Sequence, residues 1–382
     1  MIDLEQVEAT FAASVDGTVG IEEEFAILDP DTLGLVPRFE ELAQAARATD
    51  PDLAQSIAGE LIASEIEIRS GRGADLPDAF ARQRAARGRL FALAAAQGVA
   101  LGATGTHPWA DYRQQRNIDT EHYRRVVEEL QYAARRNNTF ALHVHVGVRG
   151  IDRAVAVCDR LRPVLALLLA RSANSPYLDG VDAGLHSART QAFTRTFPRC
   201  GIPDAYGSWA ALRAYVELLG RVGSIVESTQ LWWSVRPAFT FGTVEVRICD
   251  MQSTAEESEA LVGLIVACVA QAARDVDEGL PHEDLPMRLL EENLWRAIRY
   301  GMDGELVEFG RGVQEPAARA IERLLQWTEP VRSELGLDPD LPARNGAQRQ
   351  RDAIAAGASP AEVYGASVQE TLATYATQDV TA

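Results

Sequence analysis

The chain has 382 residues, of which 47% are apolar and 24% are charged. A chain of this length buries about three quarters of its unfolded surface, and this composition excludes a disordered protein or a disulfide-stapled miniprotein. The 37 basic and 55 acidic side chains give a formal net charge of −18, which repels phosphate backbones and anionic lipid surfaces. We therefore expect no nucleic-acid partner and no membrane partner.

The start of the chain and its cysteines are typical of a cytoplasmic protein. Residues 1–5 are acidic and lack the basic and apolar segments of a secretory signal. The longest uncharged stretch, residues 90–110, contains glycines, a proline and a histidine, so we interpret it as helix, turn and strand. The four cysteines are widely spaced and form no CxxC pattern, which indicates neither a zinc site nor a disulfide framework.

Hydrophobic periodicity predicts a mixed α+β fold. The expected strands lie near residues 17–29, 59–70, 99–104, 139–148, 231–239 and 242–250. The expected helices lie near residues 38–48, 76–97, 120–136, 151–172, 207–222, 254–276, 288–302, 314–335 and 360–376. The last two strands are joined by a short connection containing Gly242, which favours a hairpin. We therefore expect a largely antiparallel six-stranded sheet with helices, in a single domain spanning residues 1–382.

Charged side chains gather on one face of four expected strands. Because side chains alternate across a strand, Glu22 and Glu24 share a face, and so do His143 and His145. Glu245 shares a face with Arg247, and the charges of residues 65–69 again lie opposite isoleucines. A solvated face of an antiparallel sheet explains any one of these strands. It does not explain why four strands concentrate carboxylates, histidines and arginines beside glycine and alanine.

Clustered carboxylates repel one another and raise their own pKa values unless a cation neutralises them. Oxygen-rich ligand sets select Mg²⁺ or Mn²⁺, with histidine as an occasional ligand. Such an ion completes its shell with water and substrate phosphates, which would allow an acidic protein to hold ATP. Arg189, Arg236 and Arg247 are the candidate arginines for an anionic substrate.

An ordered set of motifs resembles the glutamate–cysteine ligase type 2 family, the YbdK-like carboxylate–amine ligases related to glutamine synthetase. The motifs lie at residues 19–25, 60–70, 105–108, 142–147, 175–177, 232–237 and 241–247. The resemblance implies a single catalytic domain with a curved, largely antiparallel half-barrel sheet, backed by helices and holding Mg²⁺, ATP and an amino acid on its concave face. It also implies a homodimer.

The resemblance assigns roles to individual residues of this chain. It implies metal ligands at Glu22, Glu24, Glu60, Glu67 and Glu245. It implies that Arg247, His145 and Glu245 take part in catalysis, and that Arg236, Arg189, His143 and Trp233 bind ATP or substrate. Glu60 is seven residues from Glu67, an odd offset that would require a bulge if both lay on one strand. The alternative for each arginine is a structural ion pair, and for His145 a role as hydrogen-bond donor only.

The implied activity is ATP-dependent amide formation. ATP would phosphorylate the side-chain carboxylate of glutamate, and an amine would attack the acyl phosphate. The family name suggests cysteine as this amine. The chain departs from the family pattern at Ser234, Thr240 and Tyr112, which leaves amine and nucleotide selectivity open. Two alternatives use the same residues: a metal-dependent phosphohydrolase, and a non-catalytic protein that binds ATP or an amino acid.

Overall fold

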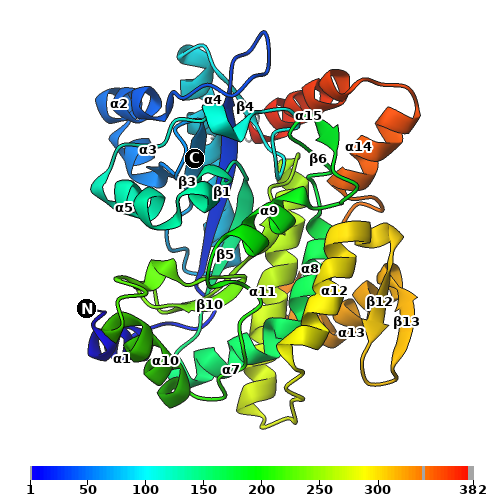
Figure 1. Cartoon of the computed structure of the whole chain (residues 1–382). Helices are drawn as coiled ribbons and strands as arrows, with labels where there is room; N and C mark the ends of the chain where they lie inside the picture. The colour runs from blue at the N-terminus through cyan, green and yellow to red at the C-terminus, as the bar shows by residue number, and fades with distance from the viewer. Residues whose placement is uncertain (1, 338–339, 377–382) are drawn as a thin grey trace.

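The computed structural model describes residues 2–337 and 340–376, and residues 1, 338–339 and 377–382 of the expected domain lie outside this part (Figure 1). An open, antiparallel seven-stranded sheet lies at its centre, in the order β10-β11-β5-β1-β3-β2, with β4 also paired to β1. The strands are β1 (Val19–Leu28), β2 (Ile57–Ala58), β3 (Glu65–Arg69), β4 (Ala100–Gly102), β5 (Ala141–Gly147), β10 (Val235–Ala238) and β11 (Thr243–Asp250). The predicted hairpin is present as β10 and β11.

One expected strand is shorter than predicted. The segment predicted as a strand over 59–70 forms a connection at 59–64 followed by β3, and the short strand β2 lies just before it. The connection pairs with residues 116–118 instead: Ala63 N donates to Arg116 O and Ile118 N donates to Leu61 O. The sheet has seven strands rather than six because β2, which was not predicted, pairs with β3. No bulge is needed between Glu60 and Glu67, because Glu60 lies in the connection.

Helices surround the sheet and form most of the second half of the chain (Figure 1). Their bounds are α1 (Leu4–Ala12), α2 (Phe39–Thr49), α3 (Pro51–Ser56), α4 (Leu76–Ala96), α5 (Glu121–Leu130), α6 (Tyr132–Arg135), α7 (Ile151–Leu161), α8 (Leu165–Ser172), α9 (Ala188–Thr196), α10 (Trp209–Arg221), α11 (Ala255–Asp277), α12 (Met287–Tyr300), α13 (Ala317–Leu335), α14 (Gly346–Ala355) and α15 (Pro360–Tyr375).

Several helical elements differ from the sequence-based expectation. The prediction omitted α1, α3, α9 and α14, and it also omitted a hairpin of β12 (Glu305–Glu308) and β13 (Val313–Pro316). The helix expected over 151–172 is interrupted at Arg162–Val164, where Pro163 lacks an amide hydrogen. The helix expected over 120–136 is interrupted at Gln131, whose φ of 50° is not helical. Short or polar helices such as α3 and α14 give only a weak periodic signal.

The apolar face of the sheet packs against helices. Ile21, Phe25, Val144 and Val246 are fully buried on this face and belong to one large cluster that includes residues of α4, α7, α8 and α11. Helix α11 lies against β5 and contacts α4, α7, α13 and α15. The four cysteines are free thiols. In residues 2–337 and 340–376, no helix combines the length and apolar character needed to cross a lipid bilayer.

One charged residue lies on this apolar side. Glu23, between Glu22 and Glu24 on β1, is fully buried and accepts two hydrogen bonds from Arg87 of α4, at 2.7 Å from Nε and 2.5 Å from Nη2. Gln83 donates to the same carboxylate at 2.8 Å, and Ser258 also donates to it. These contacts of Glu23 therefore link β1 to α4 and α11 on the apolar side of the sheet.

Replacing Arg87 by alanine would leave the Glu23 carboxylate buried without its ion-pair partner. We expect the free energy of unfolding to fall by about 3–5 kcal/mol, measured by urea denaturation. Arg82→Ala is the matched control, because Arg82 lies on the same helix and pairs with Asp78 at the surface. It should cost less than about 1 kcal/mol. Equal losses for the two variants would contradict the linking role of Arg87.

Candidate active site

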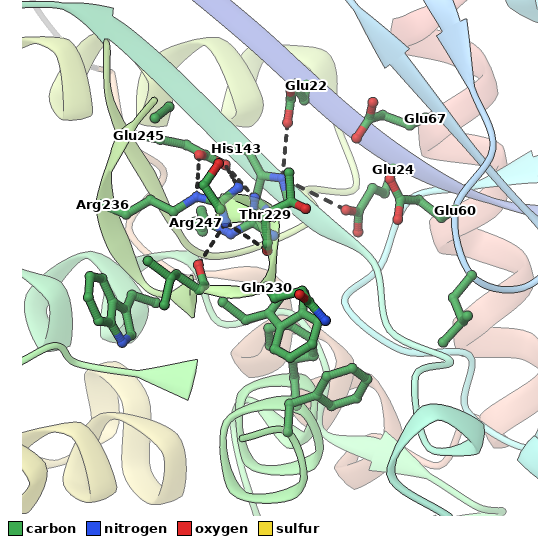
Figure 2. Close-up of a pocket in the computed structure, with 18 of the residues that line it drawn as sticks. Glu22, Glu24, Glu60, Glu67, His143, Thr229, Gln230, Arg236, Glu245 and Arg247 are labelled. Atoms are coloured by element: carbon green, nitrogen blue, oxygen red, sulfur yellow. Dashed lines mark hydrogen bonds and ion pairs between the residues drawn. The ribbon is translucent and has the colours of Figure 1, made fainter. Parts of the chain in front are cut away.

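The register of the sheet places the predicted site residues in adjacent rows on its polar face. Arg236 lies opposite Glu245, which lies opposite His145. In the next row His143 lies opposite Glu22, and Glu22 lies opposite Arg69 on its other side. Glu24 lies opposite Glu67 in the third row. Side chains of five strands thus meet over one cavity, as alternation along the separate strands predicted (Figure 2).

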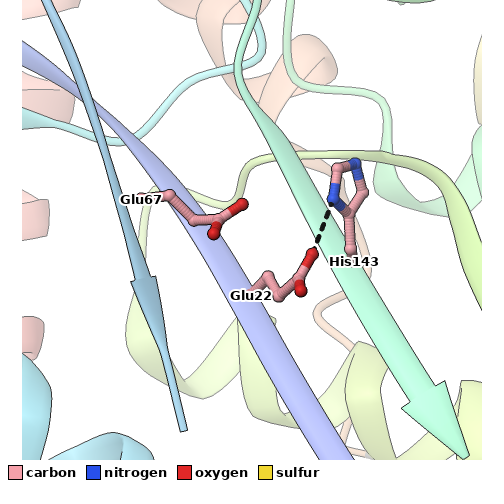
Figure 3. Close-up of side chains that lie close together, drawn as sticks. All are labelled: Glu22, Glu67 and His143. Atoms are coloured by element: carbon pink, nitrogen blue, oxygen red, sulfur yellow. Dashed lines mark hydrogen bonds and ion pairs between the residues drawn. The ribbon is translucent and has the colours of Figure 1, made fainter. Parts of the chain in front are cut away.

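Three groups of these side chains are tight enough to hold a metal ion. The groups are Glu24, Glu60 and Glu67; Glu22, Glu67 and His143; and Glu22, His145 and Glu245. Within each group, one potential ligand atom of every residue lies within 4.8 Å of the others. Figure 3 shows the second group, in which Glu67 of β3 lies beside Glu22 of β1 and Glu22 points toward His143, whose Nδ1 lies 3.2 Å from Glu22 Oε2. All seven predicted carboxylate and histidine residues belong to at least one group.

Burial and mutual repulsion oppose ionisation of the carboxylates at one end of the cavity, the acidic end, formed by Glu24, Glu60, Glu65 and Glu67. Burial, followed by the charge of Glu24, raises the pKa of Glu60 to about 8. Burial also raises the pKa values of Glu65 and Glu67 well above their usual range, with the neighbouring carboxylates adding to the effect. Burial opposes ionisation of Glu22 as well, but its interactions with the two histidines outweigh burial and hold its pKa well below the ordinary value.

This donor set fits Mg²⁺ or Mn²⁺. Oxygen atoms dominate each group, and histidine contributes one nitrogen to two of them. The buried Oε2 atom of Glu65 makes no hydrogen bond within the described part of the chain, so the acidic end also has an unused acceptor. A divalent cation would neutralise the mutual repulsion that raises these pKa values.

Glu60 reaches the acidic end from the connection between β2 and β3. The Tyr123 hydroxyl of α5 donates to Gly59 O at 2.6 Å and so fixes the residue next to Glu60. Gly59 has no space for a side chain, because an added Cβ would collide with Phe39 and Ile118. Close packing of the neighbouring backbone, rather than strand alternation, therefore places this carboxylate.

The opposite end of the cavity carries two arginines around Glu245 (Figure 2). Arg236 Nε donates to Glu245 Oε2 at 2.7 Å, and its Nη1 donates to Leu231 O at 2.7 Å and Thr229 O at 3.1 Å. Arg247 Nη1 also donates to Glu245. The Nε of Arg247 is buried and has no hydrogen-bond partner among residues 2–337 and 340–376. Arg247 therefore keeps one donor that no residue of the described part uses.

Two other predicted residues line the cavity but are largely occupied by protein contacts. Arg189, on α9, donates to the main-chain carbonyls of Arg247 and Ile248. Trp233 is buried in an aromatic cluster, with its ring stacked on Tyr215 and tilted against Tyr206. Both residues lie at the site, and their proposed contacts with ATP or substrate remain predictions.

The cavity also contains residues that the sequence prediction did not assign to the site. They are Glu65, Arg69, Tyr123, Thr229 and Gln230, among others. Glu65 and Arg69 share a face with Glu67, so alternation along β3 was a usable signal for these two. The others come from α5 and from the short 3₁₀ helix at Ser228–Gln230, whose position over the sheet leaves no pattern in the sequence.

Comparison with known proteins assigns this arrangement to a family. Residues 18–366 match the family described as Glutamate-cysteine ligase family 2 (GCS2). A protein of Solibacter usitatus (strain Ellin6076), named "Putative glutamate--cysteine ligase 2", is 38% identical over 320 residues, or 84% of this chain and 82% of its own length. A relative from Rubrobacter xylanophilus, with the same name and the suffix 2-1, is 37% identical over 344 residues, or 88% of this chain and 89% of its own length.

Solved structures share the fold at low sequence identity. The glutamate–cysteine ligase (gshA) of Francisella tularensis, in complex with AMP, has a TM-score of 0.67 at 11% identity and covers 96% of this chain and 90% of its own. The bifunctional glutathione synthetase of Pasteurella multocida has a TM-score of 0.64 at 14% identity and covers 97% of this chain and 54% of its own. The expected α+β ligase fold, an open antiparallel sheet backed by helices, is confirmed.

Divalent cation binding should depend on the acidic end. We expect Glu24→Gln and Glu67→Gln each to weaken Mn²⁺ binding at least about tenfold, because each removes a charged oxygen ligand. Isothermal titration of Mn²⁺ into the protein measures the change. Glu41→Gln is the control, since this carboxylate is 60% exposed and pairs only with Arg38 in the described part of the chain. Unchanged affinity in both site variants would exclude the metal centre.

Without divalent cations, Glu60 should destabilise the protein increasingly as pH rises. Its pKa of about 8 exceeds the ordinary value of 4.5, so between these values the folded state holds a proton that the unfolded state releases. The contribution of Glu60 to stability is thus complete below pH 4.5 and is lost as pH rises through 8. Relative to Glu60→Gln, the wild type should lose free energy of unfolding between pH 5 and 8 in chelator. Parallel pH profiles from urea titrations would contradict the raised pKa.

Proposed function

Because the chain belongs to glutamate–cysteine ligase family 2, we propose that it is an ATP-dependent ligase that joins the side-chain carboxylate of glutamate to an amine. The observation that carries this proposal is the division of one cavity into an acidic end with three possible metal groups and an end with two arginines. Such a cavity suits a substrate that combines phosphates with a carboxylate. The AMP in the Francisella tularensis neighbour supports nucleotide binding in this fold.

The proposed reaction has two steps. The carboxylate of glutamate attacks the terminal phosphorus of ATP, which forms an acyl phosphate and releases ADP. The amine then attacks the acyl carbon, a C–N bond forms, the C–O bond to phosphate breaks, and the amine proton passes to a base or to water. Mg²⁺ or Mn²⁺ held by Glu22, Glu24, Glu60, Glu67 and Glu245 would neutralise the charge of the transferred phosphoryl group.

Arg247 is our candidate for stabilising the phosphoryl group during transfer. Its guanidinium lies beside Glu245 and lines the cavity, and its Nε has no hydrogen-bond partner among the described residues. Arg236 is held by Glu245 and two main-chain carbonyls, so its orientation is fixed before any ligand binds. A fixed donor stabilises developing negative charge without reorganisation during the reaction.

The two histidines occupy different environments. His145 Nδ1 lies 2.8 Å from the Thr243 hydroxyl, and its Nε2 lies 3.3 Å from Glu22 and 3.8 Å from Glu245. Burial lowers the pKa of His145, but the two carboxylates outweigh this effect and raise it. A more readily protonated imidazole donates hydrogen bonds, so we propose that His145 orients Glu22 and Glu245 and stabilises anionic oxygen atoms. Burial, followed by the charge of Arg247, lowers the pKa of His143, so we propose that His143 acts as a neutral imidazole that hydrogen-bonds to Glu22 through Nδ1 and lies beside the substrate.

Activity should require all substrates together. With Mg²⁺ and ATP, we expect ADP to form only when both glutamate and an amine are present, and mass spectrometry should detect the corresponding amide. A panel containing ammonia, simple amines and cysteine identifies the acceptor. Phosphate release from ATP without glutamate or amine would indicate the alternative phosphohydrolase, and nucleotide binding without turnover would indicate a non-catalytic protein.

Arg247 should contribute to turnover rather than to folding. We expect Arg247→Gln to lower kcat by about 10²–10³-fold, the usual loss when a donor to developing charge is removed. Arg311→Gln is the control, because its side chain is 66% exposed in the β12–β13 hairpin region. Steady-state ADP formation measures both variants. A kcat for Arg247→Gln within threefold of wild type would contradict the assigned role.

A further inference from the structure

Strand β11 carries a bulge where it passes the arginine end of the cavity. Val246 lies opposite Val144 of β5, but Cys249 lies opposite Leu142, so β11 uses three steps where β5 uses two. A bulge of this kind leaves an extra residue outside the ladder and changes which face the later side chains occupy. The extra residue falls between Val246 and Cys249, in the segment that contains Arg247.

The bulge places charged and apolar residues on the correct faces. After it, Cys249 lies opposite Leu142 on the apolar side, and Asp250 lies opposite Ala141 on the polar side. With regular alternation from Glu245, Cys249 would instead point to the polar side and Asp250 to the core. Strand β11 can therefore present Glu245, Arg247 and Asp250 on one side only because the backbone departs from regularity between them.

Arg189 binds the backbone of this bulge. Its Nη1 donates to Ile248 O at 3.1 Å and its Nη2 donates to Arg247 O at 3.2 Å, so the guanidinium spans two consecutive carbonyls. In addition, Arg247 N donates to Ser234 O at 2.8 Å. Both main-chain polar groups of Arg247 are thus hydrogen-bonded, and the Arg189 side chain is only 6% exposed.

Arg189 is itself held by a buried hydrogen-bond network. Asp250 Oδ1 lies 3.7 Å from Arg189 Nη1 and accepts a hydrogen bond from Ser187 at 2.8 Å, while its Oδ2 accepts one from Ser175 at 2.6 Å. Ser175 Oγ in turn accepts from Arg189 N at 3.2 Å, at the start of α9. The network therefore links both the main-chain amide and the guanidinium of Arg189 to Asp250 of β11.

We propose that Arg189 is a positioning residue: it fixes the β11 bulge so that Arg247 points into the cavity beside Glu245. This inference rests on the proposed ligase function, because the consequence of misplacing Arg247 is a slower phosphoryl transfer. It replaces direct contact with ATP or substrate as the main role of Arg189. A guanidinium suits this task because its planar fork offers several donors at fixed spacing, whereas the ammonium of lysine is a compact point charge.

The test separates positioning from charge. Arg189→Lys keeps the positive charge but cannot span two carbonyls, so we expect kcat to fall at least about tenfold, with KM for ATP and glutamate within threefold of wild type. Hydrogen exchange at the Arg247 amide should accelerate in the same variant. Arg195→Lys, on the same helix and paired with Glu291 at the surface, is the control and should change neither quantity.

Two results would overturn the proposal. One is wild-type kcat and exchange in Arg189→Lys, which would show that charge alone suffices. The other is an Arg189→Gln variant whose KM for ATP or glutamate rises more than tenfold while exchange at Arg247 is unchanged, which would indicate a direct substrate contact. Hydrogen exchange needs no turnover, so absence of ligase activity in the wild type would refute the proposed function without obscuring whether Arg189 braces the bulge.

Discussion

Electrostatic repulsion among carboxylates on one face of the sheet is the constraint on which the site depends. Glu24 lies directly opposite Glu67, and Glu60 adds a third carboxylate from outside the ladder. Opposed like charges weaken a strand pair, so this arrangement costs stability unless cations bind. The cost is consistent with a cavity that is arranged for its ligands, since the same oxygen atoms that repel one another are suitably spaced to hold divalent ions.

The fold offsets this repulsion on the opposite side of the same strand. Glu23 lies between Glu22 and Glu24 in sequence but faces the helices, where Arg87 and Ser258 bind it. The ring of Tyr375, at the end of α15, lies 4.9 Å from the Arg87 guanidinium. Strand β1, which carries Glu22 and Glu24, is therefore held on its apolar side by a buried ion pair. Residues of α4, α11 and α15 contribute to this contact.

The sequence predicted those parts of the site that follow from regular alternation. The shared faces of Glu22 with Glu24 and of Glu245 with Arg247 are visible in single strands, and the structure brings these strands together. The entry of Glu60 from a connection could not be predicted, because it depends on pairing between residues 61–63 and 116–118. The bulge that redirects β11 after Arg247 was equally hidden, since it depends on contacts with Arg189 from a helix that the periodicity did not reveal.

The two ends of the cavity differ in how their charges are held. At the arginine end, each guanidinium already binds Glu245 or main-chain carbonyls, so donors are oriented before a ligand arrives. At the acidic end, the carboxylates are less completely paired: Glu65 Oε2 has no hydrogen-bond partner among the described residues, and Glu60 has a pKa of about 8. The donors of the arginine end are thus held in place by protein contacts, whereas bound cations would favour full ionisation of the acidic end. This difference supports the proposed binding of a nucleotide together with its metal ions, because cations would neutralise the acidic end and phosphate oxygens would complete their coordination.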